Sequence, residues 1–161
     1  MAATPISVSS RYIPEGVRHF YWLTAIATLS APTRAELNAG TDLTPQVGGF
    51  GNWGVQGNPV STGDLASTFT PTIPGLTTAD GTTLDMYADK TSNDARTLMP
   101  RDATGFVVVF PEGDIAGRKC DVFPVKVQSA EKTASLGGNP AMINFVYTTT
   151  AQPAENVTVP A

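Results

Sequence analysis

The stretch Gly105-Phe-Val-Val-Val-Phe110-Pro-Glu-Gly-Asp114 decides the fold that this sequence predicts. A continuous apolar run of this length is typical of a buried strand, and the Pro-Glu-Gly-Asp sequence favours a turn because of the dihedral preferences of proline and glycine. Segments 121–128 and 141–149 place bulky apolar residues at every second position, which predicts two more strands connected by residues 129–140. The residues on the apolar faces are Phe123, Val125 and Val127 in the first and Ile143, Phe145 and Tyr147 in the second. We therefore expect the run at 105–110 at the centre of the core.

Shorter elements precede this stretch. Residues 69–73 and 83–87 are predicted strands, and residues 92–98 are a predicted short helix. Asp94 suits the positive end of that helix dipole, and Pro100 ends the helix because proline cannot continue it. The pattern predicts a β-dominated chain with little helix.

A helical connector is predicted at residues 31–40. Thr33 is a suitable N-cap, Glu36 can complete a capping box, and Gly40 is a stop signal. The glycine-rich residues 47–61 are interpreted as one irregular, bulged strand followed by a loop.

Residues 17–27 predict a strand that is apolar on both faces. One face would carry Tyr21 and Leu23, and the other Phe20 and Trp22. Such a strand is covered on both sides, either by two layers of its own fold or by its own fold and a neighbouring subunit. The second alternative suits a closed ring of subunits that leaves no open sheet edge.

The length favours one domain, predicted as residues 1–161, because a chain of this size can bury about 70% of its extended surface. Residues 1–16 and 151–161 contain few bulky side chains and are interrupted by prolines, which favours extended arms. The β core would occupy residues 17–150.

Composition excludes several classes of protein. Charged residues make up 15% of the chain and hydrophobic residues 41%, which is typical of a turn-rich β protein when glycine and proline are also abundant. The net charge is −4 and there is no basic run, so we do not expect tight binding to nucleic acid. The N-terminus lacks the pattern of a secretory signal, and no apolar run approaches the ~20 residues of a membrane-crossing helix.

Three features resemble functional motifs and are assigned structural roles. Gly49-Phe-Gly-Asn-Trp-Gly54 matches a dinucleotide-binding pattern, but no buried strand precedes it and Pro59 would break a following helix. His19 is the only histidine, which excludes sites that need two imidazoles, and no nucleophile elbow accompanies it. Cys120 has no second cysteine to pair with and is predicted to be a packed small residue.

The acidic residues do not predict a metal or catalytic site. Asp80, Asp85, Asp89 and Asp94 lack the spacing of a calcium loop and are predicted caps, turn residues and edge charges. No carboxylate pair is selected for glycoside hydrolysis. We therefore predict no catalytic residue, no metal ligand and no cofactor, and we do not expect an enzyme.

Several phrases together resemble the major tail proteins, or tail tube proteins, of long-tailed bacteriophages, especially those of actinobacterial hosts. The phrases occur in the same order and spacing over most of the region 33–127. They are Ala31-Pro-Thr-Arg-Ala-Glu-Leu-Asn-Ala-Gly-Thr-Asp42, Ile73-Pro-Gly-Leu-Thr77, Tyr87-Ala-Asp-Lys90, Leu98-Met-Pro-Arg-Asp-Ala-Thr-Gly105, Asp114-Ile-Ala-Gly-Arg118 and Asp121-Val-Phe-Pro-Val125.

The resemblance implies a tail-tube fold: a β-sandwich or partial barrel of two packed antiparallel sheets with one short flanking helix. It implies self-assembly into hexameric rings stacked as a tube, with genomic DNA passing through the lumen without specific binding. The other implied partners are the tape measure, tail terminator and distal tail proteins. No interaction with a membrane is implied. The expected location is the virion tail, after assembly in the host cytoplasm.

Two other classes stay open from the sequence. The first is another structural protein of a virion or injection device, such as a contractile inner tube or a capsid decoration protein. The second is a stand-alone β-sandwich binding module with an aromatic cleft around Trp53.

Overall fold

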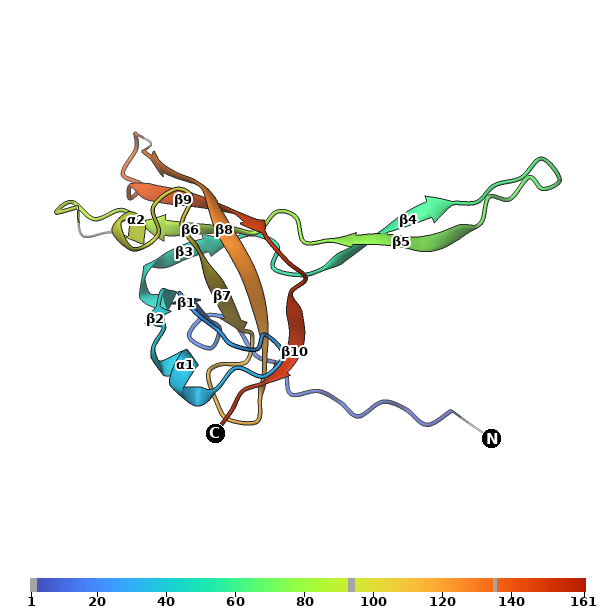
Figure 1. The fold of residues 1–161 in the computed structure, drawn as a ribbon, viewed down its shortest axis with the longest axis horizontal. Coiled ribbons are helices and arrows are strands. Elements are labelled where there is room, and N and C mark those ends of the chain that lie inside the picture. The colour runs from blue at the N-terminus through green and yellow to red at the C-terminus, as the bar shows by residue number, and fades with distance from the viewer. Residues whose placement is uncertain (1–2, 93–94, 135) are drawn as a thin grey trace.

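An antiparallel sheet forms the body of the protein in the computed structural model, which describes residues 3–92, 95–134 and 136–161. β7 (Thr104–Phe110) lies inside this sheet, between β1 (His19–Leu23) and β8 (Lys119–Thr133) (Figure 1). The strand order in the described residues is β2 (Thr41–Asp42), β1, β7, β8, β9 (Met142–Thr149), β6 (Thr83–Tyr87) and β3 (Val47–Phe50), with β10 (Ala154–Thr158) also pairing β8. The predicted mainly β, antiparallel fold is confirmed.

Two hydrophobic clusters lie on opposite faces of this sheet. The inner core includes Phe20, Trp22, Val107, Val109, Phe123, Val125, Leu84 and Phe145. The outer core includes Leu23, Leu37, Val108, Phe110, Cys120, Val122, Val157 and Val159. Residues of β7 alternate between the two cores, because successive side chains of a strand point to opposite faces. Burial on both faces explains the continuous apolar run at 105–110.

The apolar strand predicted at 17–27 is covered on both sides by the chain itself. β1 places Phe20 and Trp22 in the inner core and Leu23 in the outer core, and all three are at most 3% exposed. Of the two alternatives, the layers of the chain's own fold therefore supply the cover for this strand.

The inner core is enclosed by a partial barrel. β1 and β3 face each other across it, and the rings of Phe20 and Phe50 lie 5.4 Å apart. In the described residues no strand pairing joins β3 to β1 or to β2, the short edge strand beside β1, so the barrel stays open there. We call the gap between these two strands the seam.

The short helix α1 (Arg34–Asn38) covers the outer core. The Glu36 amide donates to the Thr33 hydroxyl (3.3 Å), and the Thr33 amide donates to the Glu36 carboxylate (2.7 Å). This reciprocal pair satisfies free amides at the helix start and confirms the predicted capping box. Leu37 is 1% exposed and packs into the outer core, so the predicted flanking helix is present.

Two smaller helical elements complete the body. The 3-10 helix η1 (Thr44–Gln46) leads from β2 into β3. The helix α2 (Ala95–Leu98) lies within the range 92–98 in which a short helix was predicted. Position 94, for which a dipole role was predicted, lies outside the described residues.

The second sheet is a hairpin that projects from the body (Figure 1). It consists of β4 (Gln56–Ser61) and β5 (Thr72–Thr78). The interpretation of residues 47–61 as one strand and a loop is wrong, because β3 and β4 belong to different sheets. The strand predicted at 69–73 begins at Thr72 and continues to Thr78.

The C-terminal residues differ from the expected arm. β10 pairs with the first part of β8, and Val157 and Val159 are 6% and 1% exposed in the outer core. β8 also runs on to Thr133, so the connection predicted at 129–140 is shorter. Residues 154–159 are therefore part of the body, held there by apolar burial and strand pairing.

Candidate assembly surfaces

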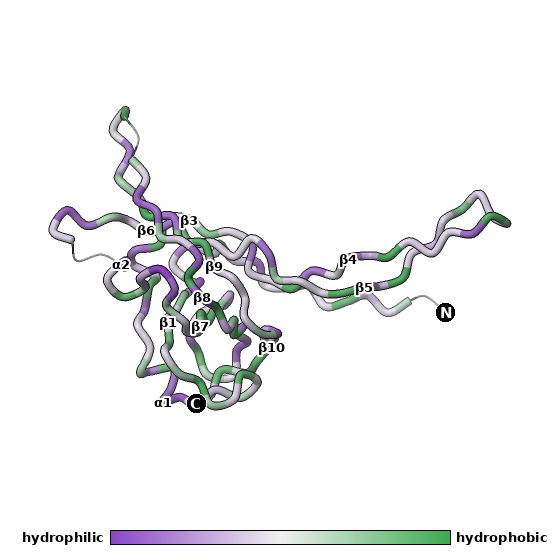
Figure 2. The backbone as a smooth tube through the Cα atoms, turned by 45° about the horizontal axis from the view of Figure 1, so that its top comes forward, coloured by the Kyte–Doolittle hydropathy of each residue, from purple (hydrophilic) through white to green (hydrophobic). Residues whose placement is uncertain are grey.

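The β4–β5 hairpin exposes apolar side chains along its whole length. Figure 2 shows hydrophobic segments distributed over this projection. Their exposed fractions are 49% for Val60, 108% for Leu65, 74% for Phe69, 53% for Ile73 and 85% for Leu76. A two-stranded hairpin alone is at best marginally stable in water, and exposed apolar clusters mark interaction sites. The hairpin therefore has the properties of an element that is completed by a partner.

The local geometry of the hairpin explains its sequence. Val60 and Ile73 lie directly opposite each other, and the register shifts next to them, between Gly57 and Pro59. At this shift a Cβ on Gly75 would lie 2.3 Å from the carbonyl oxygen of Asn58, so only glycine fits. The bulge and the two prolines of the strands, Pro59 and Pro74, interrupt regular pairing, a common feature of exposed sheet edges.

The base of the hairpin is anchored to the body. The Trp53 indole donates to the carbonyl oxygen of Thr83 (3.1 Å), and the amide of Val55 donates to Glu155 of β10 (3.1 Å). The Trp53 ring contacts Phe123 (5.1 Å between centroids) and Tyr147 (5.5 Å). Trp53 is thus a packing residue at the edge of the inner core, not the wall of an aromatic binding cleft.

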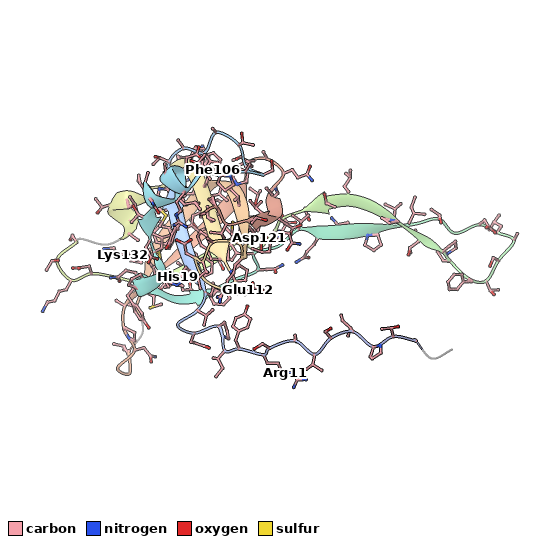
Figure 3. The ribbon with its side chains drawn as sticks, turned by 90° about the horizontal axis from the view of Figure 1, so that it is seen from below. Arg11, His19, Phe106, Glu112, Asp121 and Lys132 are labelled. Carbon is pink, nitrogen blue, oxygen red and sulfur yellow. The ribbon has the colours of Figure 1, made fainter. Side chains whose placement is uncertain are left out.

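The N-terminal segment, residues 3–13, is a second projection and points to the same side of the body as the hairpin (Figures 1 and 3). Ile6 and Val8 are 95% and 93% exposed. No backbone hydrogen bond joins this segment to the rest of the described chain, and the Tyr12 hydroxyl donates to the Pro111 carbonyl (3.0 Å). The segment has no assigned secondary structure and projects as an extended chain (Figure 1).

The residues that resembled catalytic or ligand motifs are dispersed. His19 Nδ1 lies 3.4 Å from the Thr44 hydroxyl and 3.9 Å from Asp42, so both groups approach the same ring nitrogen. A catalytic triad needs its nucleophile and its orienting carboxylate on different nitrogens, and this arrangement does not provide that. Gly49 lies in edge strand β3, and no helix follows Gly54.

Two of the four aspartates considered as calcium ligands, Asp85 and Asp89, have local partners. Asp85 accepts a hydrogen bond from the side chain of Asn144 on the neighbouring strand (2.6 Å), and Asp89 accepts one from the Thr91 hydroxyl (2.5 Å). In the ranges 3–92, 95–134 and 136–161 no group of three or more His, Cys, Asp or Glu residues is placed to hold a metal ion. None of the helices in these ranges has the length and apolar character to cross a membrane.

Cys120 is fully buried in the outer core. Burial raises the pKa of its thiol to about 11, and the negative charge of Asp121 adds to the effect. The predicted role as a packed small residue agrees with this position.

Comparison with known proteins identifies the family. The family model described as phage tail tube protein matches residues 6–161. The chain belongs to the phage tail tube protein family. It is a structural protein of the virion tail, and the resemblance of its sequence to phage tail tube proteins is confirmed. No curated protein matches this tail tube protein in sequence at a significant level.

Sequence reasoning missed the principal candidate surface of this tail tube protein. The hairpin gave no hydrophobic periodicity, because its side chains have no single buried face. The available signal was the presence of bulky apolar residues among Thr, Pro and Gly between positions 56 and 78, in a stretch with no regular apolar pattern.

Proposed function

We propose that this tail tube protein forms hexameric rings that stack into the tube through which genomic DNA leaves the virion. The observation that carries the proposal is the β4–β5 hairpin, whose faces and outer edges have no cover in the described chain. An element that is marginal alone becomes stable when a neighbour covers it. A second copy of the same chain is the partner that a tail tube family supports.

The chain combines a self-contained body with projecting segments, and this combination supports a repeated assembly. The body has its own two cores, so it can fold before it meets a neighbour. The hairpin and the N-terminal segment leave the body on one side and reach beyond it (Figures 1 and 3). A contact between different surfaces of identical subunits produces closed rings or open filaments, and a stacked tube contains both.

The charge balance suits a channel that DNA traverses. The chain carries a net charge of −4, and an acidic wall repels phosphates rather than retaining them. The proposed partners are therefore other copies, the tape measure protein inside the growing tube, the terminator and distal tail proteins at its ends, and DNA without specific binding. Assembly is proposed to take place in the host cytoplasm.

Electron microscopy of the purified protein over a range of concentrations tests this proposal. We expect tubes with a regular axial repeat and six subunits in end-on views. Sedimentation should show a cooperative shift from monomer to large assemblies. A stable monomer at every concentration, or rings of another symmetry, would overturn the hexameric tube.

A further inference from the structure

The seam between β1 and β3 contains an apolar groove of about 300 Å³. Arg18 and Phe20 form one side and residues 47–50 of β3 form the other. Pro14, Glu15 and Gly16 lie at its rim, at the point where the N-terminal segment begins. Each copy therefore presents a groove beside its own projecting segment.

One strand edge and one buried side-chain nitrogen of the groove lack hydrogen-bond partners in the described residues. β3 is the last strand of the sheet, so the backbone of its outer edge is unpaired in the described residues. Arg18 stacks over the Phe50 ring at 4.8 Å, and its Nε is buried without a hydrogen-bond partner. Buried polar groups are nearly always paired in folded proteins, and leaving one unpaired is costly. The groove thus needs an added hydrogen-bond acceptor and an added strand.

The N-terminal segment has the properties that the groove requires. Residues 6–9 read Ile-Ser-Val-Ser, which puts both apolar side chains on one face and both hydroxyls on the other. The backbone is extended, unpaired and free of proline from position 6 to position 13. Residues 6–9, in which apolar and hydroxyl side chains alternate, are as long as the four-residue strand β3. Arg11 is the only charged residue of the segment, and the groove lining carries one charge of each sign, Glu15 and Arg18, so no net charge of the groove opposes the contact.

The segment is directed away from the groove of its own chain. The amides of Val17 and Arg18 both donate to the Pro14 carbonyl (3.1 and 2.9 Å), and Gly16 has a φ of 75° that allows this turn. Beyond the turn, Tyr12 is held at the carbonyl of Pro111. The strand that fills the groove therefore comes from a second copy.

We propose that residues 6–9 of one subunit add as a strand to the outer edge of β3 in the next subunit, with Ile6 and Val8 inserted in its seam groove. A backbone carbonyl of the added strand would accept the hydrogen bond that Arg18 Nε lacks. This inference rests on the proposed self-assembly and names one of its contacts. Segment and groove are different surfaces, so the contact repeats head to tail from copy to copy.

The size of the contact determines when it forms. A stable independent interface buries about 800 Å² on each partner, and a four-residue strand covers much less. The added strand is therefore expected to act together with other contacts, such as those of the hairpin, rather than to hold two isolated subunits.

Cysteine cross-linking in the full-length protein tests the proposal. One chain carries Val47→Cys at the groove, and a second, differently tagged chain carries a single cysteine at position 6, 7, 8 or 9. Cys120 needs no replacement, because it is fully buried. Disulfides between chains should form at least fivefold faster from positions 6 and 8 than from positions 7 and 9, because a strand turns alternate side chains towards the groove.

A matched pair of charge variants gives a second measurement. Ile6→Asp with Val8→Asp should raise the protein concentration for half-assembly at least tenfold, which corresponds to about 1.4 kcal/mol. Ser7→Asp with Ser9→Asp adds the same charge on the outer face and should have a much smaller effect.

The outcomes separate this inference from the proposed tube. Tubes without the alternating cross-links, or equal effects of the two charge pairs, overturn the added strand and leave the tube intact. Alternating cross-links between chains that form no tube support the added strand and overturn the tube. A disulfide within one chain that carries both cysteines would show that the segment folds onto its own groove, and this also overturns the proposal.

Discussion

Arg34 binds Asp114 through two parallel hydrogen bonds of 2.6 Å each. The pair joins α1 to the turn after β7, which are eighty positions apart in the chain. The exposed fractions of the two side chains are 29% and 13%, so water screens the pair only partly. The guanidinium holds the pKa of Asp114 below its usual range, mainly through the hydrogen bond.

We predict that Arg34→Met destabilises the body by about 2 kcal/mol, because it leaves a half-buried carboxylate without its bidentate partner. The loss should appear as a lower midpoint in chemical unfolding. Arg101→Met is the control, since Arg101 and Asp102 are 80% and 70% exposed at 4.0 Å, and it should leave the midpoint unchanged. Equal midpoints for the two variants would contradict the role of the pair.

The raised pKa of Tyr21 predicts that the protein loses folding stability at alkaline pH. Its hydroxyl donates to Asp114 (3.1 Å), and burial together with the charge of Asp114 raises the pKa of Tyr21 to about 12. The folded pKa lies above the unfolded value of about 10, so the stabilisation is complete below pH 10 and is lost as pH rises from 10 to 12. Tyr21→Phe should remove this pH dependence, as measured by chemical unfolding at a series of pH values.

The hairpin can be tested at its glycines. Gly75→Ala places a Cβ against the Asn58 carbonyl, whereas a Cβ at Gly57 has nothing within 4 Å. We expect Gly75→Ala to impair assembly and Gly57→Ala to leave it unchanged, as followed by light scattering and electron microscopy. Both variants should unfold like the wild type, because the hairpin contributes nothing to the two cores. Normal assembly of Gly75→Ala would contradict a role for hairpin geometry.

The two faces of the hairpin should differ in importance. Val60 and Ile73 form an opposed pair on one face, and Ser61 and Thr72 form the next pair on the other face. Replacing the first pair by asparagine should weaken assembly by about tenfold or more, because about 1.4 kcal/mol or more of apolar burial in a neighbour is lost. The same change at the second pair should matter little. Sedimentation velocity at several concentrations measures the difference.

A valine-to-alanine change should lower folding stability at the C-terminal end of the chain but not at the N-terminal end. Val159 is 1% exposed in the outer core, and Val159→Ala should cost about 2 kcal/mol of folding stability through the cavity that it leaves. Val8 is 93% exposed, and Val8→Ala should not change the stability of the isolated subunit. Thermal unfolding at low concentration measures both. Equal stability of Val159→Ala and the wild type would place the C-terminal residues outside the core.

The elements that were predictable from sequence are those with a strong local signal. β7 has a continuous apolar run, β9 has a bulky apolar residue at every second position from Ile143 to Tyr147, and α1 has a capping box, so each needs only its own residues to be recognised. β10 escaped prediction because it contains few apolar residues and Asn156 adopts a φ of 56° within it. Its only signal was the spacing of Val157 and Val159, which two flanking prolines obscured.

The assembly surfaces were the least predictable part of the molecule. Periodicity in a sequence reports burial within one chain, and the hairpin is not buried within one chain. Family resemblance indicated self-assembly from the sequence, and the prolines near the N-terminus indicated an extended arm there, whereas the projecting hairpin became clear only from the fold. The open seam could not be predicted either, because it depends on which strands end the sheet.

The complete cores of the body have a mechanical consequence for a stacked tube. If neighbours touch mainly through slender outgrowths, then bending the tube deforms those outgrowths while each rigid unit keeps its internal packing. Curvature would be spread over many weak joints and would be elastic. A long tail built in this way can bend and recover its shape without any subunit beginning to unfold.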